Sequence, residues 1–161
     1  MKVFTVGHSN QSLEAFLALL ERHAVEGIVD VRSTPYSRYV SHFGREPLRE
    51  ALKKAGRFYL FLGDALGGLP GDGTFFDGEG HVLFGKIAAT EVFKAAVGRL
   101  LKGAERYRLA LMCGEEDPSG CHRHFMVGRV LRERGVRVLH IRGDGRLEDD
   151  EELARRDRLG A

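Results

Sequence analysis

The chain has 161 residues, of which 43% are hydrophobic and 30% charged, and its formal net charge is +2. This size and composition are typical of one globular domain and exclude a disordered or low-complexity chain. No apolar run reaches membrane-spanning length, and residues 1–6 lack signal-peptide features, so we expect a cytoplasmic protein with no membrane partner. Two cysteines without an export signal also fit a reducing compartment.

Charge is spread unevenly along the chain. Residues 148–161 hold six acidic residues and three arginines, so the rest of the chain carries about +5. That mildly basic body is compatible with an anionic ligand but is far from diagnostic of nucleic-acid binding. The chain has one Asn and one Gln, a depletion typical of thermophilic proteins that GC-rich coding also produces.

Predicted strands and helices alternate along the chain. Segments rich in β-branched, aromatic or continuous apolar residues predict five strands: residues 2–6, 27–31, 57–62, 108–112 and 136–141. Each of the first four is followed by apolar residues at helical spacing, over residues 12–20, 47–55, 90–101 and 121–134. Ser12 and Thr90 are suited to cap helices, whereas Gly56 and Gly135 are suited to end them.

Two segments lie outside this alternation. Residues 63–85 predict one long Gly- and Asp-rich loop, and a loop of this length in a compact domain is usually functional or mobile. Residues 148–161 predict an acidic tail or a short final helix, after an α/β domain that spans residues 1–147.

The alternation predicts the α/β class: a single domain with a mostly parallel five-stranded sheet and helices on both faces. In such folds ligands bind outside the carboxyl ends of the strands. Polar or reactive residues follow those ends, and the opposite ends carry nothing comparable. This asymmetry predicts a cleft at the carboxyl ends and favours an enzyme. The residues there include His8, Ser9, Asn10, Asp30, Arg32, Ser33, Cys113 and Glu115.

Both cysteines flank the connection between the fourth strand and the next helix. Cys113 is expected at the strand end, and Cys121, His122 and Arg123 in the first helical turn. Backbone N–H groups and the helix dipole at such a position lower a thiol's pKa and attract anions. Cys121 is therefore one candidate nucleophile; Cys113 is another, with Cys121 resolving it as a disulfide. Two buried structural cysteines remain the alternative.

Arginines from separate loops predict anion recognition, because guanidinium groups match phosphate and carboxylate geometry. His8 is a candidate for acid–base catalysis and Asp30 for orienting a neighbour. We expect His8, Arg32, Cys113 and Arg123 to approach one cavity. The candidate substrate-binding residues are Ser9, Asn10, Arg32, Ser33, Arg38, Glu115, His122 and Arg123.

Metal ligands occur in the same region without a metal-site spacing. His8, Asp30 and Glu115 have the donor types for a hard divalent ion if the substrate is a nucleotide. We predict no metal site, and the cofactor and the oligomeric state are left open. The soft and borderline ligands are Cys113, Cys121, His122 and His124.

The loop over residues 32–45 supports an alternative of a different class, a non-catalytic nucleic-acid-binding module. Aromatic and basic side chains alternate there, a mixture that stacks bases and contacts phosphates. No Walker loop or GxGxxG motif is present, so nucleotide hydrolysis and dinucleotide binding have no support. The side chains concerned are Tyr36, Arg38, Tyr39, His42, Phe43 and Arg45.

Three motifs in order, GHSN at 7–10, DVRS at 30–33 and CHR at 121–123, together with Phe43, Leu62-Gly63 and Cys113, resemble the family called domain of unknown function 488. The resemblance covers residues 3 to about 142 and implies a shared site, not a reaction. A shorter link after Leu62-Gly63 is typical of the family, so residues 69–85 are expected to modify substrate access.

A weaker likeness is to rhodanese-like and phosphatase domains, which also place a cysteine after a central strand. Asp30-Val-Arg32 resembles a rhodanese segment, but those families close a short loop with an arginine directly behind the cysteine. Here Arg123 is ten positions after Cys113 and two after Cys121. Neither spacing makes that loop, so this likeness is an analogy at the level of the fold.

Overall fold

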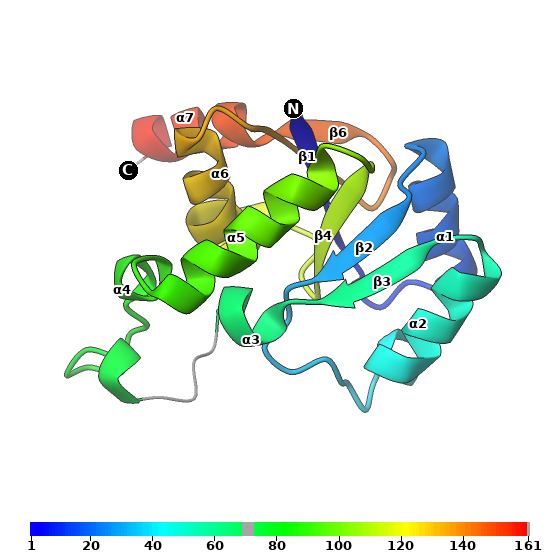
Figure 1. Ribbon diagram of the computed structural model, residues 1–161, viewed down its shortest axis with the longest axis horizontal. Helices are drawn as coiled ribbons and strands as arrows, with labels where there is room; N and C mark the ends of the chain where they lie inside the picture. Colours follow the sequence, from blue (N-terminus) through cyan, green and yellow to red (C-terminus); the bar gives the residue numbers. More distant parts are fainter. Residues whose placement is uncertain (69–72, 161) are drawn as a thin grey trace.

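A computed structural model describes residues 1–68 and 73–160 of the chain. It confirms the α/β class: one mostly parallel sheet carries helices on both faces (Figure 1). The strand order is β3-β2-β4-β1-β5-β6, and only the β5–β6 pair is antiparallel. The strands are β1 (Lys2–Gly7), β2 (Gly27–Asp30), β3 (Phe58–Phe61), β4 (Leu109–Cys113), β5 (Arg137–Ile141) and β6 (Leu147–Asp149).

Two helices cover one face of the sheet: α1 (Leu13–Arg22) and α2 (Arg45–Lys54). Further helices cover the other face or lie beside it (Figure 1): α3 (Gly63–Leu66), α4 (Phe84–Ala88), α5 (Glu91–Ala104), α6 (Arg129–Glu133) and α7 (Asp150–Gly160). Because successive strand residues point to opposite faces, the strands supply both cores. Phe4 and Ile28 pack under α1 and α2, whereas Val3 and Val29 pack under α5.

The predicted helix ends are confirmed. Ser12 Oγ accepts the backbone N–H of Ala15, and Thr90 Oγ1 accepts that of Phe93, as side-chain caps do. Gly56 and Gly135 follow their helices with positive φ angles of 75° and 77°, which glycine adopts without steric cost.

Two segments that lay outside the predicted alternation contain more regular structure than expected. Residues 63–85, predicted as one loop, contain α3, a 3₁₀ turn at Gly73–Phe75 and the start of α4. The part of that predicted loop over residues 69–72 lies outside the described residues. The sixth strand, β6, pairs with β5 and leads directly into α7. Three residues are too few to show strand periodicity, which is why the sequence predicted five strands.

The helix after β4 begins later than expected. A 3₁₀ turn, Pro118–Gly120, comes first, and the N–H of Cys121 donates to Pro118 O at 3.0 Å. A π-helical segment, Arg123–Gly128, follows, and α6 begins only at Arg129. Cys121 therefore lies just before the helical segment instead of in its first turn, and its carbonyl oxygen accepts from the N–H groups of His124 and Phe125 at 2.9 and 3.3 Å.

The topology places a crevice between β1 and β4, which are neighbours in the sheet. The chain leaves β1 toward α1 on one face and leaves β4 toward α6 on the other face. Such a switch point is where open α/β sheets bind ligands. Among the described residues, no helix is both long enough and apolar enough to cross a bilayer.

Candidate functional site

A pocket of about 530 Å³ opens at the carboxyl ends of β1, β2 and β4. Seven of the predicted site residues line it: His8, Arg32, Ser33, Cys113, Glu115, Cys121 and His122. Asp30 and Arg123 lie behind its wall, fully buried. Ser9, Asn10 and Arg38 are not among the residues that line it. The structure therefore brings together residues from three strand ends, but it keeps Arg123 away from the pocket surface.

The glycine of the GHSN motif allows the two central strands to share this end of the sheet. Gly7 pairs with Cys113 in the β1–β4 register. A Cβ atom at Gly7 would lie 1.6 Å from the backbone oxygen of Glu115. Only glycine therefore permits the loop after β4 to cross β1 at this height.

Asp30 holds Arg32 in a fixed orientation, as expected for an orienting carboxylate. Its two oxygens accept hydrogen bonds from Arg32 Nε at 2.9 Å and Nη2 at 2.8 Å. The Tyr59 hydroxyl also donates to Asp30, and burial together with this hydrogen bond raises the pKa of Tyr59. Because a bidentate pair restrains the planar guanidinium, Arg32 forms a rigid part of the pocket wall.

His8 is held as a neutral ring. A backbone carbonyl only accepts hydrogen bonds, so Nδ1–H of His8 donates to Ser9 O at 2.8 Å. Its other nitrogen, Nε2, accepts from Arg32 Nη1 at 3.3 Å. Burial, together with the nearby Arg32 charge, lowers the pKa of His8. The lone pair expected to take part in acid–base catalysis thus has a guanidinium partner in this structure.

The two cysteine sulfurs lie in contact at the floor of the pocket. Cys113 Sγ and Cys121 Sγ are 2.7 Å apart, and both cysteines are free. His122 lies on the side of Cys121, with Nδ1 3.7 Å from Sγ. The N–H at Nε2 of His122 donates to Val31 O at 2.8 Å, so in the neutral ring Nδ1 carries the lone pair.

Arg123 supplies a buried positive charge beneath this sulfur pair. Its side chain is 0% exposed, and Nη1 lies 2.7 Å from Cys113 Sγ. The same guanidinium donates to the backbone oxygens of Glu115 and Glu116 at 2.7 and 3.0 Å. The chain returns to Cys113 through the 3₁₀ turn at 118–120, so a separation of ten residues brings the arginine to the sulfur after all.

The sulfur pair is suited to be the anionic partner of Arg123. An arginine stays protonated in proteins, and a buried charge is stabilised by a counter-charge. Within residues 1–68 and 73–160, no carboxylate forms an ion pair with Arg123. Loss of one proton from the sulfur pair would supply that counter-charge.

The pKa values of the two sulfurs shift in opposite directions. The hydrogen bond from Cys113, with smaller contributions from His122 and Arg123, lowers the pKa of Cys121 to about 3. The hydrogen bond to Cys121, together with burial, raises the pKa of Cys113. These directions favour the negative charge on Cys121, although the guanidinium of Arg123 contacts Cys113.

The sequence did not reveal three buried polar residues behind the thiols: Thr5, His140 and Asp150. His124, considered above as a metal ligand beside the cysteines, instead faces Asp150. Ligand atoms of His124, His140 and Asp150 lie within 4.8 Å of one another, as in clusters that hold a metal ion. One sequence signal could have revealed this cluster: a histidine at an inward-facing position of β5. Buried polar groups require partners, so that histidine implied further polar residues nearby.

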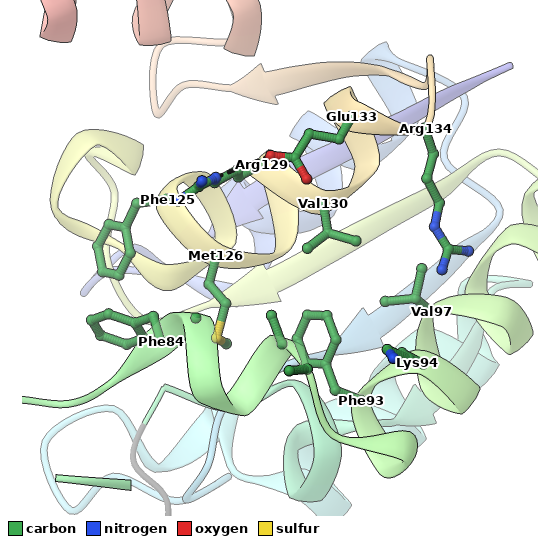
Figure 2. A pocket seen from close by; sticks show the side chains of 13 residues that line it. Phe84, Phe93, Lys94, Val97, Phe125, Met126, Arg129, Val130, Glu133 and Arg134 are labelled. Carbon is green, nitrogen blue, oxygen red and sulfur yellow. Dashed lines mark hydrogen bonds and ion pairs between the residues drawn. The ribbon is translucent and has the colours of Figure 1, made fainter.

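A second pocket, of about 410 Å³, lies between α4, α5 and the segment 125–134 (Figure 2). Figure 2 shows Phe84 and Phe125 facing each other at one end and Lys94 and Arg134 at the other. Phe84 and Phe125 line both pockets and so lie between them. None of the predicted site residues lines this groove, so the candidate site remains the pocket above the thiols.

Comparison with known proteins yields one match. A family model described as domain of unknown function DUF488 matches residues 12–130, most of the chain. The matched range contains the DVRS and CHR motifs and both cysteines. No curated protein and no solved structure matches the chain.

Proposed function

The chain belongs to the DUF488 family, and since that description names no activity, we propose from the geometry that it is a thiol enzyme acting on an anionic substrate. The observation that carries the proposal is the buried contact of Cys113, Cys121 and Arg123 at the floor of a pocket. A thiolate next to a buried cation and open to a cavity is the arrangement of a nucleophile. Two packing cysteines would not require a fully buried guanidinium.

Cys121 is the nucleophile in this proposal, and it attacks as the thiolate. His122 lies beside it, with Nδ1 3.7 Å from Sγ and the N–H at Nε2 bonded to Val31 O. The Cys121 sulfur forms a bond to an electrophilic centre of the substrate. The bond from that centre to the leaving group breaks, and the leaving group departs as an anion with the bonding electron pair.

Arg32 supports the choice of an anionic substrate. A guanidinium has five N–H groups, and three of those on Arg32 donate to Asp30 and His8. The two remaining N–H groups belong to a side chain that lines the pocket. Tyr36 and Phe84 add aromatic surfaces to the lining, which suits a nucleotide-like substrate.

We expect iodoacetamide to label Cys121 at least about tenfold faster than Cys113, with an apparent pKa below the reference of about 8.5. The pKa directions require this order, because Cys121 carries the charge and Cys113 the proton. Mass spectrometry of peptides after timed alkylation measures both rates. Iodoacetate is the anionic analogue of iodoacetamide. The ratio of its labelling rate to that of iodoacetamide should be higher for Cys121 than for a model cysteine peptide, because the pocket favours anions.

The Cys113→Ser variant is the matched control for that experiment. It should keep Cys121 reactive, since a serine hydroxyl can donate the hydrogen bond that Cys113 gives to Cys121 and His122 remains beside it. The proposal of a reactive thiolate would be wrong if neither thiol is labelled in the folded protein, or if Cys121 titrates like a free cysteine. Co-purified metabolites, identified by mass spectrometry, would then name the substrate class.

The nucleic-acid-binding alternative retains support from exposed tyrosines. Tyr36 is 68% exposed and Tyr39 89% exposed, and Arg38 between them is also exposed. The rest of the loop is occupied: Phe43 is buried against Phe16, and Arg45 covers the Phe61 ring. Two aromatic faces and one cation therefore remain for stacking and phosphate contact.

If this alternative holds, Arg38→Ala should weaken binding to single-stranded DNA or RNA and reduce its salt dependence by about one charge. Cys121→Ser is the matched control and should leave binding unchanged. Fluorescence anisotropy at 50 and 200 mM salt measures both. No binding to single- or double-stranded nucleic acid at the lower salt would remove this alternative.

A further inference from the structure

A hydrogen-bonded path leaves the thiol site through the sheet. Arg123 Nε donates to Thr5 Oγ1 at 3.0 Å, and Thr5 Oγ1 lies 2.6 Å from His140 Nδ1. Thr5 and His140 are direct partners in the β1–β5 register. Thr5 shares its sheet face with Val3, the face on which Arg123 of the π-helical segment reaches it. The path is therefore built into two central strands.

The path continues to the C-terminal helix. His140 Nε2 lies 2.7 Å from Asp150 Oδ1, and Asp150 is the first residue of α7. Asp150 also binds His124 and Arg132. His124 in turn contacts Asp157 Oδ2 at 2.8 Å, and that carboxylate is 52% exposed. Five buried side chains, those of Arg123, Thr5, His140, Asp150 and His124, thus connect Cys113 to the exposed Asp157 on α7.

The direction of each hydrogen bond is determined by the ends of the path. Arg123 can only donate, and the ionised Asp150 can only accept. The hydroxyl of Thr5 must therefore accept from Arg123 and donate to His140 Nδ1, and His140 Nε2 donates to Asp150. Burial lowers the pKa of His140, in agreement with a neutral ring.

We propose that Thr5, His140 and Asp150 are positioning residues that hold the guanidinium of Arg123 against the sulfur of Cys113. Asp150 orients the His140 ring, the ring orients the Thr5 hydroxyl, and the hydroxyl fixes Arg123 Nε. The inference rests on the proposed thiol chemistry and extends it. It makes α7 part of the site, although α7 contributes no residue to the pocket.

A metal site formed by His124, His140 and Asp150 is the alternative explanation of this buried cluster, and it explains fewer of the hydrogen bonds. Coordination by His140 Nε2 would require Nδ1 to carry the proton, which would leave the Thr5 hydroxyl without its acceptor. The Arg132 guanidinium on Asp150 also opposes a further cation there. The hydrogen-bonded path from Arg123 to Asp150, called the relay below, gives each polar hydrogen atom along it an acceptor. Among the described residues no buried side-chain N or O atom lacks a partner.

The test compares Thr5→Val, which removes the hydroxyl at nearly constant volume, with Thr5→Ser, which keeps it. The readouts are thiolate absorbance near 240 nm against pH and the pH–rate profile of alkylation. Thr5→Val should raise the apparent pKa of the reactive thiol and slow alkylation about three- to tenfold at a pH below the wild-type value, and Thr5→Ser should restore both. The other charged groups facing the thiols, His8, Arg32, Glu115, His122 and Arg123, are the same in all variants.

The far end of the relay supplies a second variant with its own control. Asp150→Asn should shift the thiol pKa in the same direction as Thr5→Val. Asp149→Asn, at the neighbouring residue whose carboxylate binds Arg137, should not shift it. Folded Thr5→Val or Asp150→Asn protein with a wild-type profile would overturn the relay.

A separate readout distinguishes failure of the relay from failure of the thiol chemistry. The Nε–H of Arg123 is buried and bonded to Thr5, so NMR of ¹⁵N-labelled protein should show it exchanging slowly with solvent. Cys121→Ser should keep that protection, whereas Thr5→Val should lose it. A protected Nε–H with an unreactive Cys121 would contradict only the proposed function. An unprotected Nε–H in the wild-type protein would overturn the relay.

Discussion

Replacing Gly7 with alanine should lower the free energy of unfolding by about 3 kcal/mol and abolish fast thiol alkylation. The new Cβ would lie 1.6 Å from Glu115 O and 2.4 Å from its carbonyl carbon, and both are backbone atoms. Backbone cannot move aside as a flexible side chain can, so β1 or the loop after β4 must shift. That loop supplies the Glu115 carbonyl that Arg123 binds. The free energy of unfolding and the alkylation rate of the thiol should therefore both decrease in this variant.

Urea unfolding and timed alkylation measure the two losses. Gly98→Ala is the matched control, because Gly98 lies inside α5 and no atom would lie within 4 Å of its added Cβ. That variant should be more stable than the wild type by about 0.5 to 1 kcal/mol, the usual gain for alanine in a helix interior. A Gly7→Ala protein with normal stability and normal thiol reactivity would contradict the close approach of the two chains.

Replacing Arg123 with methionine should cost about 3 to 5 kcal/mol of stability and raise the pKa of the reactive thiol. Methionine fills much of the space but donates no hydrogen bond. The carbonyls of Glu115 and Glu116 would lose their donor, and the Cys121 thiolate would lose its buried counter-charge. At a pH below the pKa of the wild-type thiol, alkylation should slow more than tenfold. Arg123→Lys keeps the charge but loses the planar guanidinium. Its stability and its thiol pKa should lie between those of the wild type and of Arg123→Met.

The stability difference between wild type and Cys121→Ser, which has no thiol at this position, should also depend on pH. The folded pKa of Cys121 is about 3, lowered by Cys113, His122 and Arg123, and a free thiol titrates near 8.5. Between these values the unfolded chain binds more protons, so the thiolate stabilises the wild type increasingly as pH rises. The difference should therefore be larger at pH 8 than at pH 5. Equal differences at both values would show that the thiol is neutral in the folded protein.

The class of the fold and the location of the site follow from patterns within short segments. β-Branched runs, apolar faces and the caps at Ser12 and Thr90 predict the strand–helix alternation, because each depends on neighbours a few residues away. Parallel strands joined by helices all end at one edge, so residues such as His8 and Cys113 had to gather there.

The roles of the site residues depended on contacts between distant segments. Arg123, expected to face a ligand, is buried and faces Cys113, because residues 114–122 turn back over β4. Cys121, expected in the first turn of a helix, lies just before the helical segment because a 3₁₀ turn takes its N–H. Local spacing does not specify the path of an irregular loop, so neither outcome could be predicted.

Strand order decided the remaining contacts. Thr5 and His140 are 135 residues apart in the chain and become neighbours because β1 lies between β4 and β5. Asp150 reaches His140 because β6 turns back along β5 and delivers the start of α7 to the sheet. Periodicity shows which face a residue occupies but not which strand lies beside it. The sequence therefore predicted reactive thiols at a sheet edge, and only the tertiary structure supplied the buried charge and the relay behind them.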